Sequence, residues 1–190
     1  MTRETAEGIT INVDLDGVVA DLHSALIYMS GGPPPFKSDI THWEHPIAKG
    51  IWEKLKTPEI YDWMPPIAQA REHVNGLYDS GYKVVIVSNR PPEAFDYTER
   101  WLDSFGFKVD GIMLTDDKNK AGPHILIDDK PENVWRYADS VGPAILFSQP
   151  WNQNWTIPGT PNPLLRCKGW DETLQRVRNL INVQHLYGVR

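Results

Sequence analysis

Residues 9–18 read ITINVDLDGV, a short apolar segment that ends in two aspartates and a glycine. The β-branched residues at its start predict a buried β-strand, and the polar run that follows ends it. Gly17 allows a tight backbone turn after the strand, so that Asp14 and Asp16 can both point into one site. This stretch therefore predicts a strand that delivers two carboxylates to one edge of a sheet.

Four further short segments share this apolar character: residues 83–87, 111–114, 124–127 and 144–147. Several of them are apolar throughout rather than alternating, and helical patterns separate them along the chain. Strands that are apolar on both sides are typical of a parallel sheet covered by helices on both faces. We therefore predict an α/β fold, a Rossmann-like parallel sheet of five strands.

The helices of this fold are predicted from apolar residues at helical spacing and from their flanking prolines and glycines. The first begins at Leu22, and a second is expected to open at Pro65-Pro66, where proline suits the first turn. Asp171 is expected to cap the last helix. Residues 148–163 are rich in Asn, Gln, Pro and Trp, and are predicted to form a loop.

Residues 36–64 differ in character, because they combine tryptophans with histidines and prolines. Only one short helix is suggested there, around residues 51–55, so the segment reads as an insertion rather than as part of the sheet. The 190 residues are 41% hydrophobic, which suffices for one core plus a small accessory module. We expect a core of residues 1–21 and 65–190, with residues 22–64 forming a small helical cap inserted after the first strand.

Composition excludes several classes of protein. The net charge is -6 and there is no basic block, so binding to long nucleic acids is not expected, although a mononucleotide needs only a local positive site. The single cysteine, Cys167, lacks a partner for a disulfide or a zinc site and is expected to be a buried structural thiol. No apolar signal core or bilayer-spanning run is found, so a cytoplasmic protein without membrane contact is expected. A homodimer is one of the assemblies that the sequence leaves open.

The polar residues collect directly after the predicted strands. They are Asp14 and Asp16, then Ser88 and Asn89, then Asp116, Asp117 and Lys118, and finally Asp128 and Asp129. Ligands of open parallel sheets bind at the carboxyl ends of the strands. Carboxylates gathered there would repel each other strongly unless a cation lies among them, and hard oxygen ligands favour Mg²⁺.

Such a set of residues suits phosphoryl transfer. A carboxylate can attack phosphorus and form an aspartyl-phosphate, and a second carboxylate can protonate the leaving oxygen and later activate water. A lysine, hydroxyl groups and the metal hold the phosphate oxygens. Lys118 is favoured over Lys120 and Lys130 because it follows a strand end, whereas Arg90 is expected either to bind phosphate or to lie at the surface.

Two other readings of the acidic residues remain weaker. A calcium loop starting at Asp14 would need an oxygen ligand and then a glycine where Val18 and Val19 stand. A phospho-receiver domain would carry its reactive aspartate after a middle strand, but here Ser88 and Lys118 end the middle strands. An inactive relative that only binds a nucleotide has no support, since all the reacting groups are present.

The chain resembles the haloacid-dehalogenase superfamily of phosphatases in four places. The segment Asp14-Leu15-Asp16-Gly17-Val18 resembles its first motif, Ser88 its second, Lys118 its third, and Ile127-Asp128-Asp129 its fourth. Residues 112–118, 126–130, 144–147 and 169–171 are in addition similar to the cytosolic 5'(3')-deoxyribonucleotidases. This resemblance extends over residues 9–180.

The resemblance implies a role for the residues of the first three motifs. Asp14 would be the nucleophile and a metal ligand, and Asp16 would be the acid and base, with its backbone carbonyl on the metal. Ser88 and Lys118 would bind phosphate. Asn89 would be a further phosphate contact, although it stands where the family often has another hydroxyl residue.

The fourth motif and the cap complete the implied site. Asp129 would bind Mg²⁺ directly, and Asp128 would act alongside it, through water or as support. In that family a small helical cap closes over base and sugar, and Trp43, Trp52 and Trp63 are the candidates for stacking on a base. The substrate implied is a ribo- or deoxyribonucleoside monophosphate, with a sugar phosphate or another small metabolite as the main alternative.

Overall fold

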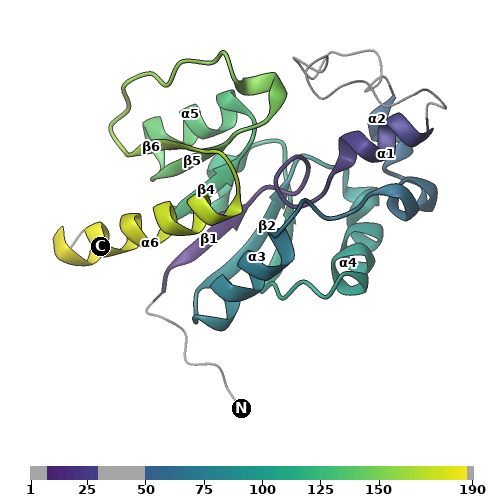
Figure 1. Cartoon of the computed structure of the whole chain (residues 1–190), viewed down its shortest axis with the longest axis horizontal. Helices are drawn as coiled ribbons and strands as arrows, with labels where there is room; N and C mark the ends of the chain where they lie inside the picture. The colour runs from purple at the N-terminus through teal and green to yellow at the C-terminus, as the bar shows by residue number, and fades with distance from the viewer. Residues whose placement is uncertain (1–7, 30–49, 188–190) are drawn as a thin grey trace.

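The computed structural model describes residues 8–29 and 50–187 (Figure 1). Six strands of the described residues form one parallel sheet in the order β3-β2-β1-β4-β5-β6. Their bounds are β1 Thr10–Val13, β2 Lys83–Ser88, β3 Gly111–Leu114, β4 Ile125–Asp128, β5 Ala144–Phe147 and β6 Leu164–Cys167. The predicted α/β class and parallel sheet are confirmed.

Helices connect these strands. The α-helices are α1 Leu22–Met29, α2 Ile51–Lys54, α3 Ala70–Asp79, α4 Phe95–Ser104, α5 Pro131–Ser140 and α6 Trp170–Tyr187. Short 3₁₀ turns are η3 Pro58–Trp63, η4 Pro92–Ala94, η5 Lys118–Ala121 and η6 Pro150–Asn152. None of the helices in the described part of the chain combines the length and apolar character needed to cross a bilayer.

Helices cover both faces of the sheet, because successive side chains of a strand point to opposite sides. Ile125 and Ile127 of β4 belong to a large core cluster that includes Val177 of α6. Leu126, between them, belongs to a second cluster together with Val134 of α5. The uninterrupted apolar run of β4 therefore reflects burial on both sides, as predicted. Helices α3 and α6 contact each other on the face seen in Figure 1.

One strand was missed by the sequence analysis. Strand β6 pairs with β5 in parallel, with Ala144 opposite Leu164 and Phe147 opposite Cys167. It has only four residues, one of them Arg166, and it follows directly on the predicted loop. A strand this short at the sheet edge is recognised by its pairing partner rather than by its own pattern.

The start of α3 corrects the expectation for Pro65-Pro66. The helix begins at Ala70, after Gln69 in a left-handed conformation with a φ of 66°. The prolines instead belong to an extended segment, in which Pro66 bridges Ala20 in antiparallel fashion. The Asp21 N–H donates to the Pro65 carbonyl at 2.8 Å. This pairing joins segments far apart in sequence, so local proline preferences did not reveal it.

Asp171 also differs from its expected role as a cap. Helix α6 begins one residue earlier, at Trp170, and Asp171 lies in its first turn. The Asp171 carboxylate lies 2.9 Å from His73 Nε2 and accepts a hydrogen bond from Gln69 Nε2. It thus ties α6 to α3.

The described parts of residues 22–64 pack on the sheet domain. Leu26 of α1, Leu55 after α2 and Ile60 of η3 are fully buried in the same core cluster as β1. Residues 30–49 lie outside the described residues, and the division into core and cap stays a prediction.

Candidate active site

The strand order creates a crevice at the carboxyl edge of the sheet. From β1 the chain proceeds outward to β2 and β3, and then returns to β4 on the other side of β1. Ligands of open α/β sheets bind where the strand order reverses in this way. A cavity of about 430 Å³ lies there, lined by residues that include Asp14, Ser88 and Asp129.

Three buried aspartates form the floor of this crevice. The Asp14 N–H donates to the Ile127 carbonyl at 2.8 Å, which brings the end of β1 alongside the end of β4. Asp14, Asp128 and Asp129 each present a ligand atom, and these atoms lie within 4.8 Å of one another. Their buried oxygens are the hard donors that Mg²⁺ prefers. The donor set therefore fits a divalent cation.

Lys118 is the predicted lysine that reaches the aspartates. Its side chain is 2% exposed, and its Nζ contacts Asp14 Oδ1 and lies 2.8 Å from Asp128 Oδ2. Lys120 is exposed and 3.8 Å from Asp116, and Lys130 is exposed as well. One ammonium group cannot neutralise three carboxylates, so the cluster keeps a negative charge that a cation would offset.

The pKa values reflect this imbalance. Burial is the largest cause and raises the pKa of Asp14 to about 8, while the charge of Lys118 lowers this pKa and the charges of Asp128 and Asp16 raise it. Burial and the charges of Asp14 and Asp128 raise the pKa of Asp129 well above its ordinary value. Burial lowers the pKa of Lys118, but the adjacent carboxylates outweigh it and leave this pKa raised. Both members of the Asp14–Lys118 pair thus have raised pKa values, Asp14 mainly through burial and Lys118 through the adjacent carboxylates.

Asp16 lies apart from the other three carboxylates and is held by Arg90. Arg90 Nε donates to Asp16 Oδ2 at 2.9 Å, and Nη2 donates to Oδ1 at 2.6 Å. Nη1 donates to Thr98, and the guanidinium lies 5.1 Å from the centre of the Tyr61 ring. Arg90 is 2% exposed, so the expectation that it lies at the surface is wrong, whereas phosphate binding by Arg90 stays a prediction. In the sequence, the signal for this pairing was the position of Arg90 next to a predicted strand end, at the edge of the sheet where acidic side chains were expected to gather.

Ser88 and Asn89, two of the three residues predicted to bind phosphate, line the cavity. Ser88 is buried at the end of β2, and its Oγ accepts a hydrogen bond from the Arg90 N–H at 3.2 Å. Asn89 is half-buried and lies 3.4 Å from the Asp116 carbonyl. Their position is compatible with phosphate binding, which stays a prediction.

Asp128, the last residue of β4, and Asp129, which follows it, have different surroundings. Asp128 accepts hydrogen bonds from the Lys130 N–H and from Asn133 Nδ2, in addition to its contact with Lys118. A carboxylate with three donors has little capacity left for a metal. This favours Asp129 as the direct ligand, with Asp128 as its support. Asn133 was not found from the sequence, where it reads as a helix surface residue.

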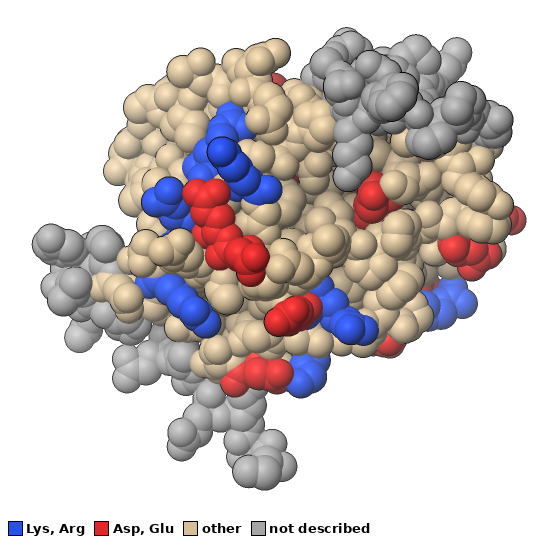
Figure 2. Space-filling view, viewed as in Figure 1, with Lys and Arg blue, Asp and Glu red and all other residues tan. Residues whose placement is uncertain are grey.

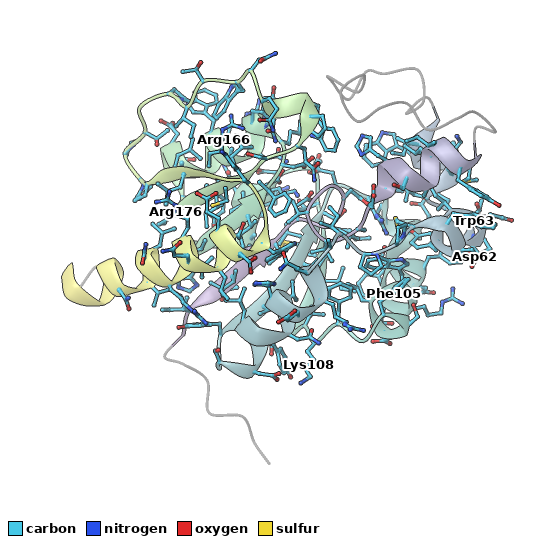
Figure 3. All side chains as sticks on the ribbon, viewed as in Figure 1. Asp62, Trp63, Phe105, Lys108, Arg166 and Arg176 are labelled. Atoms are coloured by element: carbon cyan, nitrogen blue, oxygen red, sulfur yellow. The ribbon has the colours of Figure 1, made fainter. Side chains whose placement is uncertain are left out.

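The loop after β5, predicted only as a loop, also reaches the site. Asn152 Nδ2 donates to the Asp129 carbonyl at 2.7 Å, and Gln149 Nε2 donates to the Gly17 carbonyl at 2.6 Å. Arg166 of β6, labelled in Figure 3, donates to Asn152 Oδ1 at 3.0 Å and fixes the loop. Strand β6, which was not predicted from the sequence, thus helps to hold the backbone at Asp129, the last residue of the fourth motif.

The predicted base-stacking tryptophans have different positions. Trp52 is 50% exposed and lines the cavity together with Leu22 and Ile51. Trp63 stacks on Tyr28 at 3.8 Å between ring centres and is not one of the described residues that line the cavity (Figure 3). Trp43 lies outside the described residues. Of the two candidate base-stacking tryptophans that the structure describes, Trp52 is the one that lines the cavity.

Charged side chains of both signs are interspersed on the visible face of the molecule (Figure 2). On this face the described residues form no continuous basic track of the kind that follows a nucleic-acid backbone.

Comparison with known proteins identifies the family. The family described as "5' nucleotidase, deoxy (Pyrimidine), cytosolic type C protein" matches residues 7–183. A protein of Chlorobaculum tepidum, whose name proposes it as a 5'(3')-deoxyribonucleotidase, is 27% identical over 154 residues, 70% of this chain and 75% of the relative. A phosphonoacetaldehyde hydrolase of Vibrio campbellii is 35% identical over 68 residues, which cover 36% of this chain and 25% of that protein.

Solved structures show the same fold. An L-2-haloacid dehalogenase aligns with a TM-score of 0.59 and 13% identity, covering 89% of this chain and 99% of its own. A D,D-heptose 1,7-bisphosphate phosphatase from B. bronchiseptica aligns with a TM-score of 0.56 and 14% identity, covering 90% and 98%. The chain belongs to the cytosolic type C 5' nucleotidase family and is a phosphatase of the haloacid-dehalogenase superfamily.

The raised pKa values predict how the stability of the metal-free protein depends on pH. The folded-state pKa of Asp14, about 8, exceeds its ordinary value of 3.8, so the folded protein binds protons that the unfolded chain has released. We expect the Tm of the metal-free protein to fall as the pH rises from 5 to about 8. Thermal unfolding in EDTA, followed by circular dichroism, measures this slope.

Two controls accompany this measurement. Asp14→Asn should flatten the slope, and Mg²⁺ should raise the Tm most at the higher pH, where the carboxylates are charged. A metal-free protein that is most stable at pH 8 would contradict the excess negative charge of the cluster.

Proposed function

We propose that this chain is a Mg²⁺-dependent phosphomonoesterase that hydrolyses nucleoside monophosphates to nucleoside and phosphate, with deoxyribonucleotides preferred. The observation that carries the proposal is the buried group of Asp14, Asp128, Asp129 and Lys118, which faces a cavity with an apolar wall at Trp52. A cytoplasmic location is part of the proposal. A homodimer stays a prediction.

The metal would be held by Asp14 and Asp129, with the backbone carbonyl of Asp16 as a further ligand and Asp128 in support. Bound there, Mg²⁺ would offset negative charge on the carboxylates and on the phosphate oxygens. Lys118 supplies a second positive charge, and Ser88 and Asn89 supply hydrogen bonds to phosphate.

The reaction would take place in two steps. In the first, a carboxylate oxygen of Asp14 attacks phosphorus while the bond to the ester oxygen breaks, and Asp16 donates a proton to the departing nucleoside. In the second, Asp16 removes a proton from water, which attacks the phosphorus and releases phosphate and free Asp14. The same carboxylate thus serves first as acid and then as base.

Arg90 would position Asp16 for both steps. A bidentate pair of arginine and carboxylate fixes direction as well as distance. In the observed arrangement each Asp16 oxygen accepts one hydrogen bond from Arg90 and keeps a second lone pair that can carry the proton. Arg90 thereby sets the resting position from which Asp16 acts.

The cavity supports a nucleotide as the substrate. Its volume of about 430 Å³ lies in the range of small-molecule sites. The indole of Trp52 offers an aromatic face for a base, and Leu22 and Ile51 offer an apolar wall for the sugar. An unpaired 2' hydroxyl against such a wall would cost about 1–3 kcal/mol, which would favour deoxyribonucleotides.

Phosphate release from a panel of substrates tests the proposal. We expect a deoxyribonucleoside monophosphate to have the highest kcat/KM, above the matching ribonucleotide and above sugar phosphates without a base. Activity should require Mg²⁺, should be poorly supported by Ca²⁺, and should disappear reversibly in EDTA. Asp14→Asn should remove turnover in a folded protein, because an amide is a far poorer nucleophile.

Two results of this panel would count against the proposal. A sugar phosphate as best substrate would refute the nucleotidase assignment and leave the aspartate chemistry intact. Full activity after chelation, or in Asp14→Asn, would refute the chemistry itself.

Replacing Arg90 tests the positioning of Asp16. Arg90→Lys keeps the charge but loses the two-pronged contact, and we expect kcat for nucleotides to fall roughly 10- to 100-fold. Aryl phosphates need less protonation of the leaving group, so their kcat should fall less. The control is Arg100→Lys, since Arg100 of α4 lies over Tyr97 and is not among the described residues that line the cavity. An equal loss for both kinds of substrate would show that Arg90 does not act through Asp16.

Replacing Trp52 tests the base contact. We expect Trp52→Ala to raise KM for nucleotides roughly 5- to 150-fold, because stacking on a base is worth about 1–3 kcal/mol. Hydrolysis of an alkyl phosphate without a base should change little. Trp63→Ala is the matched control, because Trp63 stacks on Tyr28 away from the cavity lining. Equal KM changes in the two variants would remove Trp52 from the substrate site.

A further inference from the structure

Asp129 is held by an indole that the proposed reaction does not use. Trp151 Nε1, from η6, donates a hydrogen bond to Asp129 Oδ2 at 2.7 Å. A carboxylate has two oxygens that can bind a cation, and one of them is thus engaged by the indole. The other oxygen, Oδ1, is the one left for a metal.

The backbone of the first motif packs closely against both Asp129 and Trp151. A Cβ at Gly17 would lie 2.4 Å from Asp129 Oδ2 and 3.1 Å from Cζ2 of Trp151. Only glycine therefore fits here, and its φ of 85° is also one that side chains rarely adopt. The glycine backbone, the Asp129 carboxylate and the indole are thus in mutual close contact, which restricts the rotation of the carboxylate.

The indole is itself fixed by its neighbours. Its ring stacks on His23 of α1, with 4.1 Å between ring centres and 22° between planes. The adjacent Asn152 is buried and donates to the carbonyls of Asp129 and Phe147. Trp151 therefore carries its N–H on a ring that cannot easily turn away.

We propose that Trp151 is a positioning residue that reserves a single oxygen of Asp129 for the metal and thereby favours Mg²⁺ over Ca²⁺. Mg²⁺ demands six ligands in near-ideal octahedral geometry, whereas Ca²⁺ accepts six to eight and readily takes both oxygens of one carboxylate. Groups that orient metal ligands typically change metal affinity 10- to 100-fold when they are replaced. The inference rests on the proposed function in one respect, because it takes the aspartate cluster as the metal site.

The test measures metal binding without substrate. Mg²⁺ and Ca²⁺ are titrated separately into the metal-free protein by calorimetry, and the thermal shift at saturation is recorded. In Trp151→Phe, which keeps a ring to stack on His23, we expect the Kd for Mg²⁺ to rise roughly 10- to 100-fold. The Kd for Ca²⁺ should rise less or fall, so that the ratio of the two Kd values shifts toward Ca²⁺.

The matched control is Trp155→Phe. Trp155 lies in the same loop but packs against the second core cluster, around α5. It should change neither Kd, and the Tm of the metal-free protein reports the packing loss in both variants. If Trp151→Phe does not fold, 3-benzothienylalanine at Trp151 replaces the N–H by sulfur and keeps the ring shape, with the same expected shift.

The outcomes separate the two proposals. If the unaltered protein binds no Mg²⁺, the metal site of the proposed function fails. If it binds Mg²⁺ and the loss of the indole N–H leaves the ratio of Kd values unchanged, the role of Trp151 is refuted and the metal site stands. An equal loss of affinity for both ions would likewise refute selectivity through Trp151.

Discussion

The confinement of three aspartates and one lysine at the carboxyl edge of the sheet is the constraint on which the rest of the site depends. Burial disfavours each charge, and Lys118 offsets only one of three carboxylates, so the pKa values of Asp14 and Asp129 are raised. Parallel strands impose this crowding, because β1 and β4 are neighbours and both end in acids. A site of this kind is unfavourable for the folded protein alone and becomes favourable once a divalent cation is bound.

The described parts of the segment between β1 and α3 support Asp16, the proposed acid and base, and Asp129, the proposed metal ligand. From η3, Tyr61 lies under the guanidinium of Arg90, which holds Asp16. From α1, His23 stacks on Trp151, which holds Asp129. A change in the position of this segment would thus shift both Asp16, the proposed acid and base, and Asp129, the proposed metal ligand. The described parts of the predicted cap are therefore in contact with the residues that hold Asp16 and Asp129.

The sequence was sufficient for the features that depend on local pattern. Buried strands such as residues 83–87 carry apolar runs, and their polar ends lie at one edge, so the α/β class and the meeting of Asp14, Asp128 and Lys118 could be anticipated. Features that depend on partners distant in sequence could not. Arg90 is buried with hydrogen bonds from two of its nitrogens to Asp16 and from the third to Thr98, and the prolines before α3 pair with Ala20 and Asp21. Trp151 lies in a segment that the sequence predicts only as a loop, and its contact with Asp129 is seen only in the folded structure.

The central claim is that Asp14 itself attacks phosphorus. Its most direct test is to mix the protein with Mg²⁺ and a deoxyribonucleoside monophosphate, stop the reaction with acid during turnover, and determine peptide masses after proteolysis. The account predicts one added phosphoryl group on the peptide that contains Asp14, located on that residue and removed by hydroxylamine. Continued turnover with no phosphoryl group on Asp14, or with the group on another residue, would contradict it.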